Sequence, residues 1–286
     1  MGILSIQSHV VYGYVGNRAA TFPLQRLGHE VYTINTVQFS NHTGYGKWRG
    51  EIFSPEHIAE LAQGLADLGV LLECQAVLSG YLGKPEIGHE VLRIVQTCRQ
   101  ANPKLTYLCD PVMGDVGRGI FVDSQIPAFI KAHAVPQASI LTPNHFEMEL
   151  LVGHSIQSLE EARLACINLR SHSQQIIVIT SFKREDAPPN ILEMFLSTLE
   201  GCFLITTPYL DFPKPPNGTG DLFSALFLGH YLQQNDPVSA LELSASSIYG
   251  ILAFTFSQKL REMQIIKAQA ELVQPKHKFK CQKLFN

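Results

Sequence analysis

The chain has 286 residues, of which 45% are hydrophobic, and it carries a formal net charge of −3. This length can bury a full core, and no repeat or change of composition divides it, so we expect one domain over residues 1–286. The small charge gives no field that would attract nucleic acid or anionic lipid. No uninterrupted apolar run approaches the roughly 18 residues of a membrane span, and the start lacks a secretory signal. We therefore expect a cytoplasmic protein without nucleic-acid or membrane partners.

The cysteines and histidines exclude a metal-binding framework. Six cysteines are scattered without a C-x-x-C pair, and the eleven histidines form no H-E-x-x-H or H-x-H pair. This usage predicts free thiols in a reducing compartment and no zinc chemistry. Four lysines at the end of the chain alternate with other residues, which indicates a half-exposed final strand rather than a binding arm: Lys276, Lys278, Lys280 and Lys283.

Short apolar runs alternate with amphipathic stretches along the chain. The first strand is expected at Ile3–Gln7, followed by a turn at Gly13–Gly16 and a helix with Asn17 as its N-cap. The later strands are expected at Val31–Asn35, Ala76–Ser79, Leu105–Cys109, Ser139–Leu141 and Ile176–Ile179, with a hairpin of Ile191–Ser197 and Cys202–Thr206. Helices are expected from Ser54-Pro55-Glu56, at Pro85–Ala101, at Leu159–Ser171 and from Gly218 to about Ser257. This alternation predicts right-handed crossovers and a mainly parallel sheet with helices on both faces.

Ligands of such sheets bind beyond the carboxyl ends of the strands. Polar and glycine-containing segments follow five of the expected strands: Ser8-His9, the loop Val37–Gly50, Gly80-Tyr81, Asp110-Pro111 and Thr142-Pro143-Asn144. These segments are therefore expected to meet at one edge of the sheet.

The segment Asn217-Gly218-Thr219-Gly220-Asp221 leads directly into an apolar helical run. Its glycines allow the backbone to come close to a ligand, and its N–H groups at a helix start form an anion site. An ordinary helix N-cap is the alternative interpretation of Gly-Asp before a helix. The chain contains neither a Walker loop nor a dinucleotide fingerprint.

The Gly218–Asp221 sequence resembles the anion-hole motif of the ribokinase superfamily. The segments LSIQSHV at residues 4–10 and VQFSNHTG at residues 37–44 resemble the pyridoxal kinase branch of that superfamily. Further matches follow in family order at Ser79–Tyr81, Cys109–Asp115, Leu141–Asn144 with Glu147, and Val178–Ser181. The resemblance covers residues 4 to about 228 and implies a ribokinase-like three-layer α/β sandwich. It also implies a homodimer that phosphorylates pyridoxal at its 5′-hydroxyl with ATP.

The resemblance implies a catalytic base and a substrate pocket. Asp221 matches the family's base, and Gly218, Thr219 and Gly220 match its anion hole. Ser8 matches a hydrogen-bond partner of the pyridine ring, Thr43 another substrate contact, and Tyr81 the aromatic side chain that packs on the ring. From the residues alone, Ser8 is equally consistent with a capping hydroxyl, and Tyr81 with core packing at a strand end. His42 is interpreted as a loop hydrogen-bonder.

The resemblance also implies a nucleotide and cation site. Asp110, Asn144 and Glu147 match the group that holds the ATP phosphates and their cations, and because a carboxylate repels phosphate, Mg²⁺ and water must intervene. The N-x-x-E spacing of Asn144 and Glu147 is also typical of a capping box, and both roles are compatible. Asp115 and Thr142 match a monovalent-ion position. The remaining matches to nucleotide contacts are Thr180, Ser181, Leu210, Asp211, Phe212 and Thr219.

Two features depart from the family pattern. The loop between Asp115 and Val122 is shorter than in some relatives and carries Phe121 where they have tyrosine, and residues 211–216 are rich in proline. A helix start lowers the pKa of a carboxylate such as Asp221, which weakens it as a base, although late proton loss in phosphoryl transfer tolerates this. A hydroxymethylpyrimidine or sugar kinase and a non-catalytic vitamin B6 carrier remain as alternatives, and the intact Asp221 argues against the carrier.

Overall fold

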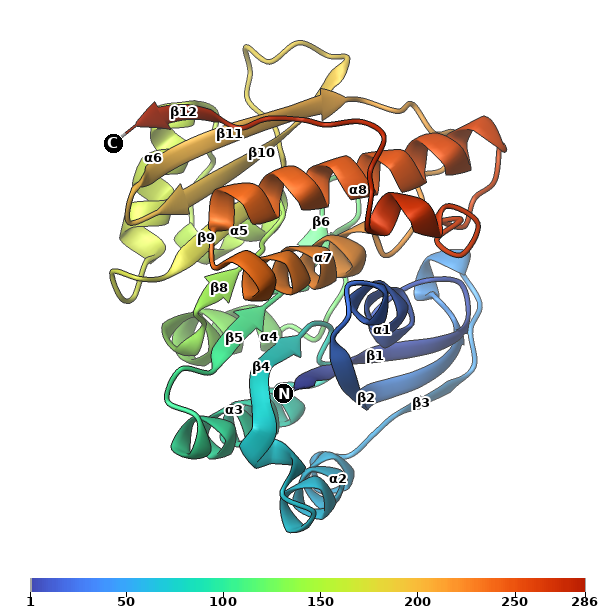
Figure 1. Ribbon diagram of the computed structural model, residues 1–286, viewed down its shortest axis with the longest axis vertical. Helices are drawn as coiled ribbons and strands as arrows, with labels where there is room; N and C mark the ends of the chain where they lie inside the picture. Colours follow the sequence, from blue (N-terminus) through green and yellow to red (C-terminus); the bar gives the residue numbers. More distant parts are fainter. Residues whose placement is uncertain (1, 286) are drawn as a thin grey trace.

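A computed structural model describes residues 2–285 of the chain (Figure 1). Ten strands form one sheet in the order β12-β11-β10-β9-β8-β5-β4-β1-β2-β3, and β6 and β7 form a separate hairpin. The strands are β1 (Gly2–Tyr12), β2 (Glu30–Asn41), β3 (Gly50–Ile52), β4 (Cys74–Ser79), β5 (Thr106–Cys109), β6 (Gly114–Asp115), β7 (Gly119–Ile120), β8 (Ile140–Leu141), β9 (Ile176–Phe182), β10 (Ile191–Thr198), β11 (Gly201–Pro208) and β12 (Gln282–Phe285).

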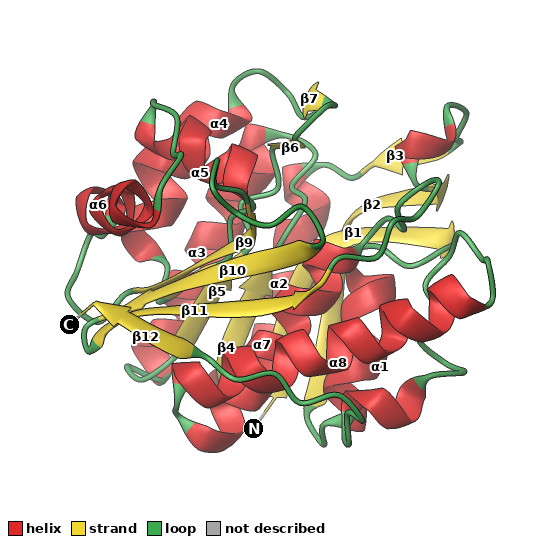
Figure 2. Ribbon diagram, turned by 90° about the horizontal axis from the view of Figure 1, so that it is seen from above, coloured by secondary structure: helices red, strands yellow, loops and turns green. Residues whose placement is uncertain are grey.

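The helices lie in two layers, one on each face of the sheet (Figure 2). Short 3₁₀ and π turns at residues 43–45, 70–73, 130–137 and 269–272 supplement them. The helices are α1 (Asn17–Arg26), α2 (Pro55–Asp67), α3 (Pro85–Ala101), α4 (Ile126–Phe129), α5 (His145–Val152), α6 (Leu159–Leu169), α7 (Thr219–Gln234) and α8 (Pro237–Ser257).

The centre of the sheet is parallel and its two edges are antiparallel. Strands β2, β1, β4, β5, β8 and β9 pair in parallel, whereas β3, the β10–β11 hairpin and β12 pair antiparallel. The parallel pairs are joined by crossovers that contain helices, as βαβ units require. The predicted three-layer fold with a mainly parallel sheet is confirmed.

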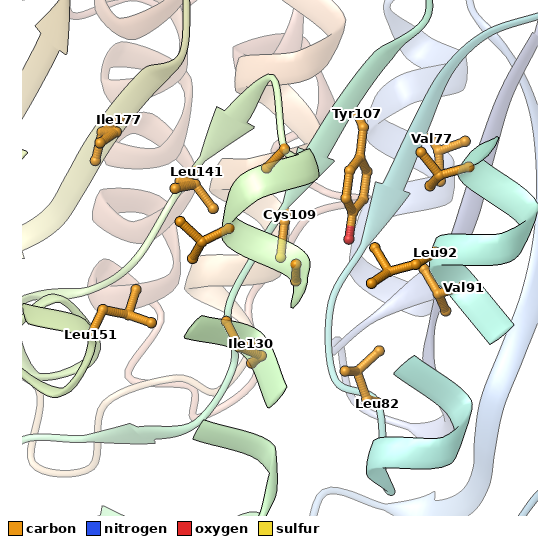
Figure 3. Close-up of a cluster of buried hydrophobic side chains, with 14 of the residues drawn as sticks. Val77, Leu82, Val91, Leu92, Tyr107, Cys109, Ile130, Leu141, Leu151 and Ile177 are labelled. Atoms are coloured by element: carbon orange, nitrogen blue, oxygen red, sulfur yellow. The ribbon is translucent and has the colours of Figure 1, made fainter. Parts of the chain in front are cut away.

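Each face of the sheet has its own hydrophobic core. Helices α2 to α6 cover one face, where Val77 and Tyr107 from the strands lie beside Val91 and Leu92 of α3, and Leu141 belongs to the same cluster (Figure 3). Helices α1, α7 and α8 cover the other face. Neighbouring strand residues alternate between the two cores because side chains of a strand point to opposite faces. Both cores leave the carboxyl ends of the parallel strands free for a site.

Local sequence signals place most helix starts correctly. The side chain of Ser54 accepts a hydrogen bond from the His57 N–H at the start of α2, with Pro55 in the first turn. Helix α3 has the predicted bounds. The predicted helical region from Gly218 to Ser257 is interrupted at Asn235, which has a positive φ of 53°, and Asp236 caps α8.

Asn17 was wrongly predicted to be the N-cap of α1, because Gly16 holds that position. The Asn17 side chain is buried and accepts from Ser5 Oγ at 2.7 Å, and its Nδ2 donates to the Ile34 carbonyl at 3.0 Å and to Asn35 Oδ1 at 2.8 Å. It joins β1, β2 and α1 through a buried polar network. Such a network outweighs the capping preference because buried polar atoms need partners.

Two expectations for the rest of the chain have mixed outcomes. All six cysteines are free, as predicted. The final strand is confined to residues 282–285, so three of the four alternating lysines precede it. Helix α8 is long and apolar enough to span a membrane by length and hydropathy alone. Ten of its residues are buried in the described fold, and buried core helices pass the same test.

Candidate active site

A cavity of about 550 Å³ opens at the carboxyl ends of the parallel strands. It is bounded by the loops after β1, β2, β4, β5 and β8, by the start of α7 and by one side of α8. The predicted site residues that line it are Ser8, Thr43, Tyr81, Asp110, Asp115, Thr142, Asn144, Glu147, Thr180, Ser181, Leu210, Phe212, Gly218, Thr219, Gly220 and Asp221. The carboxyl-end rule therefore locates the cavity correctly.

Asp211 is the one predicted site residue that does not line this cavity. It lies at the tip of a tight turn, where the Phe212 N–H donates to the Leu210 carbonyl at 2.9 Å. The turn directs Leu210 and Phe212 into the cavity and leaves Asp211 exposed. The match of Asp211 to a nucleotide contact stays a prediction, because the residue lies beside the cavity and not in its lining.

The anion loop is held in a conformation that requires glycine. Gly218 has a φ of 81°, and any side chain there would overlap the Tyr14 carbonyl oxygen. Gly218 is the N-cap of α7, and no side chain caps the helix start. The first N–H groups of α7 are therefore available to an anion in the cavity.

Asp221 lies in the first turn of α7 and lines the cavity. Burial raises its pKa, and this effect exceeds the lowering by the nearby N–H groups of Gly16 and of Asp221 itself. The expectation that the helix start would lower this pKa was wrong, because removal of water from the carboxylate costs more than the amides return. A raised pKa suits a proton acceptor.

Asp110 is buried on the floor of the cavity, with 5% of its surface exposed. Ser224 Oγ donates to Asp110 Oδ2 at 3.0 Å and lies 2.8 Å from Thr142 Oγ1. Burial and the negative charges of Glu147 and Asp221 hold the pKa of Asp110 well above its usual range. The carboxyl groups of Asp110, Glu147 and Asp221, which we call the floor carboxylates, are thus close enough for the charges of the last two to disfavour ionisation of Asp110.

Asn144 and Glu147 form a capping box at the start of α5, the alternative that their spacing left open. Glu147 accepts hydrogen bonds from the N–H groups of Asn144 and Met113, both at 2.9 Å, and of Gly114 at 3.4 Å. Asn144 Nδ2 donates to the Gly114 carbonyl at 2.8 Å. The pair therefore also anchors the base of the β6–β7 hairpin. Residues 114–120 of this hairpin are called the flap below.

Thr142 and Asp115 occupy different parts of the cavity. Thr142 is buried beside Ser224 on the floor, whereas Asp115 is exposed in the flap and accepts from the Val116 N–H at 2.7 Å. Phe121, which directly follows the flap, lines the cavity and is half-exposed.

One end of the cavity has the form expected for a flat aromatic ring. Val10, Val15 and Phe39 form a small apolar cluster against which Tyr81 packs. Burial raises the pKa of Tyr81, so its hydroxyl stays protonated. Ser8 and Thr43 supply hydroxyl groups at the same end, and His42 Nδ1 accepts from the Gly44 N–H at 3.0 Å, the predicted role in its loop. A polar ring can stack and form hydrogen bonds here.

The opposite end combines polar strand ends with an apolar wall. Thr180 and Ser181 lie near the end of β9, and Ser181 has a φ of 51°, a left-handed conformation that is rare outside glycine and recurs at functional sites. Leu210 and Phe212 line the cavity together with Leu192, Met194 and three residues of α8: Ile248, Tyr249 and Leu252. An apolar slot beside polar strand ends suits a nucleotide base.

Several cavity residues were not predicted. Lys183 follows β9 directly, so the carboxyl-end rule could have identified it. Asn217 begins the segment singled out as an anion site, although no role was assigned to its side chain, and nothing local marks Arg118 on the flap as a cavity residue. Tyr249 and Leu252 belong to a continuous apolar helix, and only packing decides which of its residues face the cavity.

Comparison with known proteins agrees with this architecture. A family model described as phosphomethylpyrimidine kinase matches residues 34–265. An anion loop at a helix start, a buried aspartate beside it and this match define the class: a ribokinase-like small-molecule kinase.

The chain is also similar to individual kinases over almost its whole length. It is 48% identical over 286 residues to pyridoxal kinase PdxY of Deinococcus radiodurans, covering 99% of this chain and 96% of the relative. It is 47% identical over 280 residues to pyridoxal kinase PdxY of Rubrobacter xylanophilus, with 98% and 96% covered. The solved pyridoxal kinase from Leishmania donovani in complex with ADP and pyridoxamine superposes with a TM-score of 0.89 at 30% identity, covering 99% of both chains. The chain belongs to the pyridoxal kinase family.

Proposed function

We propose that this protein transfers the γ-phosphoryl group of ATP to the 5′-hydroxyl of pyridoxal, giving pyridoxal 5′-phosphate and ADP. The observation that carries the proposal is that Asp221 and the anion loop line one cavity, which has an apolar end that fits a flat ring and another end that suits a nucleotide. Family members supply the substrate class, since the Leishmania donovani enzyme was solved with ADP and a B6 vitamer.

In this reaction Asp221 accepts the proton of the 5′-hydroxyl. The bond between that oxygen and the γ-phosphorus forms as the bond from the γ-phosphorus to the bridging oxygen breaks, and ADP leaves with the electron pair. The N–H groups from Gly218 to Gly220 donate to the γ-phosphoryl oxygens as negative charge develops there. The raised pKa of Asp221 favours proton acceptance near neutral pH.

The floor carboxylates fit a Mg²⁺ requirement. Among residues 2–285 no group of three or more His, Cys, Asp or Glu side chains forms a complete metal site, so a hard cation would share its ligands with ATP phosphates and water. Asp110 is the residue best placed to hold it, directly or through water, with Glu147 beside it. When bound, Mg²⁺ neutralises phosphate charge. Thr142 and Asp115 are proposed for a monovalent cation, on the family resemblance alone.

We further infer that the protein is a cytoplasmic homodimer and that each chain is one kinase domain. One continuous sheet that includes strands from both ends of the chain supports the single domain. Six free thiols support a reducing compartment. Light scattering of the purified protein tests the dimer, and a mass of one chain would contradict it.

The function is tested by ADP release with pyridoxal, pyridoxine, pyridoxamine, hydroxymethylpyrimidine and ribose as acceptors. We expect the highest kcat/KM with a B6 vitamer. The phosphomethylpyrimidine kinase match makes hydroxymethylpyrimidine the second candidate, and preference for it would replace the proposal. Stoichiometric binding of pyridoxal without ATP-dependent formation of pyridoxal phosphate would indicate a carrier instead.

A further inference from the structure

The cavity is lined by more acidic than basic side chains. Asp110, Asp115, Glu147 and Asp221 line it, whereas Arg118 and Lys183 are its only Lys or Arg residues in the described part of the chain. ATP adds further negative charge, and phosphoryl transfer requires that this charge be stabilised. Arg118 and Lys183 are therefore the side chains of the cavity lining that can offset this negative charge.

Arg118 is placed at the tip of a hairpin whose base is fixed. The flap base is held by the hydrogen bonds from Asn144 and to Glu147, and its turn is closed by the Arg118 N–H, which donates to the Asp115 carbonyl at 3.1 Å. Gly117 and Gly119 flank Arg118 with positive φ and open space around them. Small backbone rotations at the tip can therefore move the guanidinium without disrupting the base.

The contact of Arg118 with Asn217 uses only two of the five N–H donors of the guanidinium. Its two terminal nitrogens both lie 3.3 Å from Asn217 Oδ1, so two donors share one neutral oxygen. A guanidinium has five donors in a fork that matches two oxygens of a phosphate or carboxylate. Binding a phosphoryl group would therefore add strong bonds without requiring Arg118 to leave Asn217.

Asn217 has an unpartnered group of its own. Only 7% of its surface is exposed, it lines the cavity, and its Nδ2 is buried without a hydrogen-bond partner. A buried amide nitrogen without a partner is costly, and a ligand oxygen would satisfy it. Asn217 also directly precedes Gly218, so its amide and the anion loop face one space.

Arg118 is also close to the substrate end. After burial, the positive charge of Arg118 is the largest influence that lowers the pKa of His42, which belongs to the loop that carries Thr43. The guanidinium is thus near the loop that carries Thr43, and it lines the same cavity as the nucleotide-binding end. A transferred phosphoryl group must cross this cavity.

We propose that Arg118 is a further catalytic residue, whose guanidinium binds the γ-phosphoryl oxygens of ATP, and that Asn217 both positions this guanidinium and contacts the same group. Asn217 Oδ1 retains one guanidinium N–H, and Asn217 Nδ2 donates to the same phosphoryl group. Arg118 transfers no proton; it stabilises charge while the group passes to the acceptor oxygen. The role in turnover rests on the kinase function proposed above.

The test begins with Arg118→Ala. We expect kcat to fall roughly 10²-fold, the usual cost of one lost charge-stabilising donor, with the KM for pyridoxal changed less than about twofold. Free guanidinium ion should restore part of kcat, which loss of a structural contact would not permit. Arg93→Ala is the control, because Arg93 is exposed on α3 and pairs only with Glu90 at 2.7 Å.

Nucleotide binding gives a second readout that does not depend on turnover. Arg118→Ala should weaken binding of the ATP analogue AMP-PNP about tenfold or more and leave ADP binding almost unchanged, since ADP lacks the γ-phosphate. Equal losses for both nucleotides, or kcat within about threefold of wild type, would overturn the proposal. If wild type does not phosphorylate pyridoxal, the proposed function fails, whereas the AMP-PNP comparison still decides the role of Arg118.

The role of Asn217 is tested by non-additivity. Asn217→Ala should lower kcat about tenfold in the wild type but by much less in the Arg118→Ala background, because its effect passes mainly through the guanidinium. Additive losses in kcat would show that Asn217 does not position Arg118.

Discussion

The floor and the rim of the cavity are built from different interactions. On the floor, Asp110 and Glu147 are buried and accept hydrogen bonds of 2.9 to 3.4 Å, and their pKa values are raised by burial. At the rim, the loop after β2 that carries Thr43 is held by three half-exposed residues, Tyr45, Arg261 and Glu262, which we call the clasp. The Tyr45 hydroxyl donates to Glu262, the Arg261 guanidinium lies 3.7 Å from the centre of the Tyr45 ring, and its Nη2 lies 3.3 Å from the Gly44 carbonyl oxygen.

This difference shows how one cavity separates chemistry from recognition. Charges on the floor have little water around them, so each lost partner is expensive and each proton matters. The clasp joins residues 217 positions apart in the sequence through contacts that remain partly solvated, and such contacts are worth less. Changes on the floor should therefore affect turnover and stability, and changes at the rim should affect substrate affinity.

The largest effect is expected for Asp221→Asn. Loss of the proton acceptor should lower kcat by roughly 10²–10⁴, the range for general-base catalysis, with little change in the KM for ATP. Steady-state kinetics with pyridoxal measures this, and Asp67→Asn, an exposed aspartate on α2, is the control. Turnover close to wild type in Asp221→Asn would disprove its role as base.

Glu147→Ala should have the largest effect on stability. It leaves the buried N–H groups of Met113, Gly114 and Asn144 without their acceptor, which costs roughly 3 kcal/mol of the free energy of unfolding. The matched control is Glu161→Ala, since Glu161 completes an exposed capping box on α6 and should cost only about 1 kcal/mol. Urea unfolding compares the two, and equal losses would contradict the contrast between buried and exposed sites.

The floor carboxylates should make the protein less stable as pH rises from 6.5 to 8. Burial raises the pKa of Glu147 from 4.5 to about 8, so in this interval the folded state binds more protons than the unfolded state, and the free energy of unfolding falls with pH. One such group contributes at most about 1.4 kcal/mol per pH unit. Below pH 6.5 the effect is opposed by His42 and His230, whose pKa values are lowered to about 4 mainly by burial.

Urea unfolding at the two ends of this pH interval measures the slope. Glu147→Gln should flatten it, and Mg²⁺ with ADP should reduce it if a cation neutralises the floor. A slope unchanged by Glu147→Gln would show that Glu147 does not carry the excess proton.

The smallest effect is expected at the rim, for Tyr45→Phe. Removal of the hydroxyl that donates to Glu262 should cost about 1 kcal/mol of loop stabilisation and raise the KM for pyridoxal roughly fivefold, with kcat unchanged. Tyr12→Phe is the control, because the Tyr12 ring packs edge-on against Tyr45 and keeps that packing as phenylalanine. A loss of kcat in Tyr45→Phe would place the clasp in the chemical step.

The residues themselves predicted those parts of the molecule that depend on neighbouring positions in the chain. Helix α3 begins and ends where Pro85 and the apolar spacing indicate, and the Gly218–Asp221 loop starts a helix as its composition requires. The position of the cavity followed from the alternation of strands and helices, since the carboxyl ends of parallel strands share one edge. Recognition of the B6 substrate class depended on family resemblance at residues 4–10 and 37–44.

Only the tertiary structure decided features that depend on burial or on distant contacts. Asn17 carries a capping residue's signature but forms a buried bridge between β1 and β2, and the pKa of Asp221 rises because the cavity excludes water from it. The clasp at Tyr45 and the pairing of Arg118 with Asn217 join segments whose separation in sequence conceals their contact. Local pattern thus determined the elements and the edge where the site lies. Desolvation and long-range packing, which no short stretch of sequence encodes, determined the charges and partners within it.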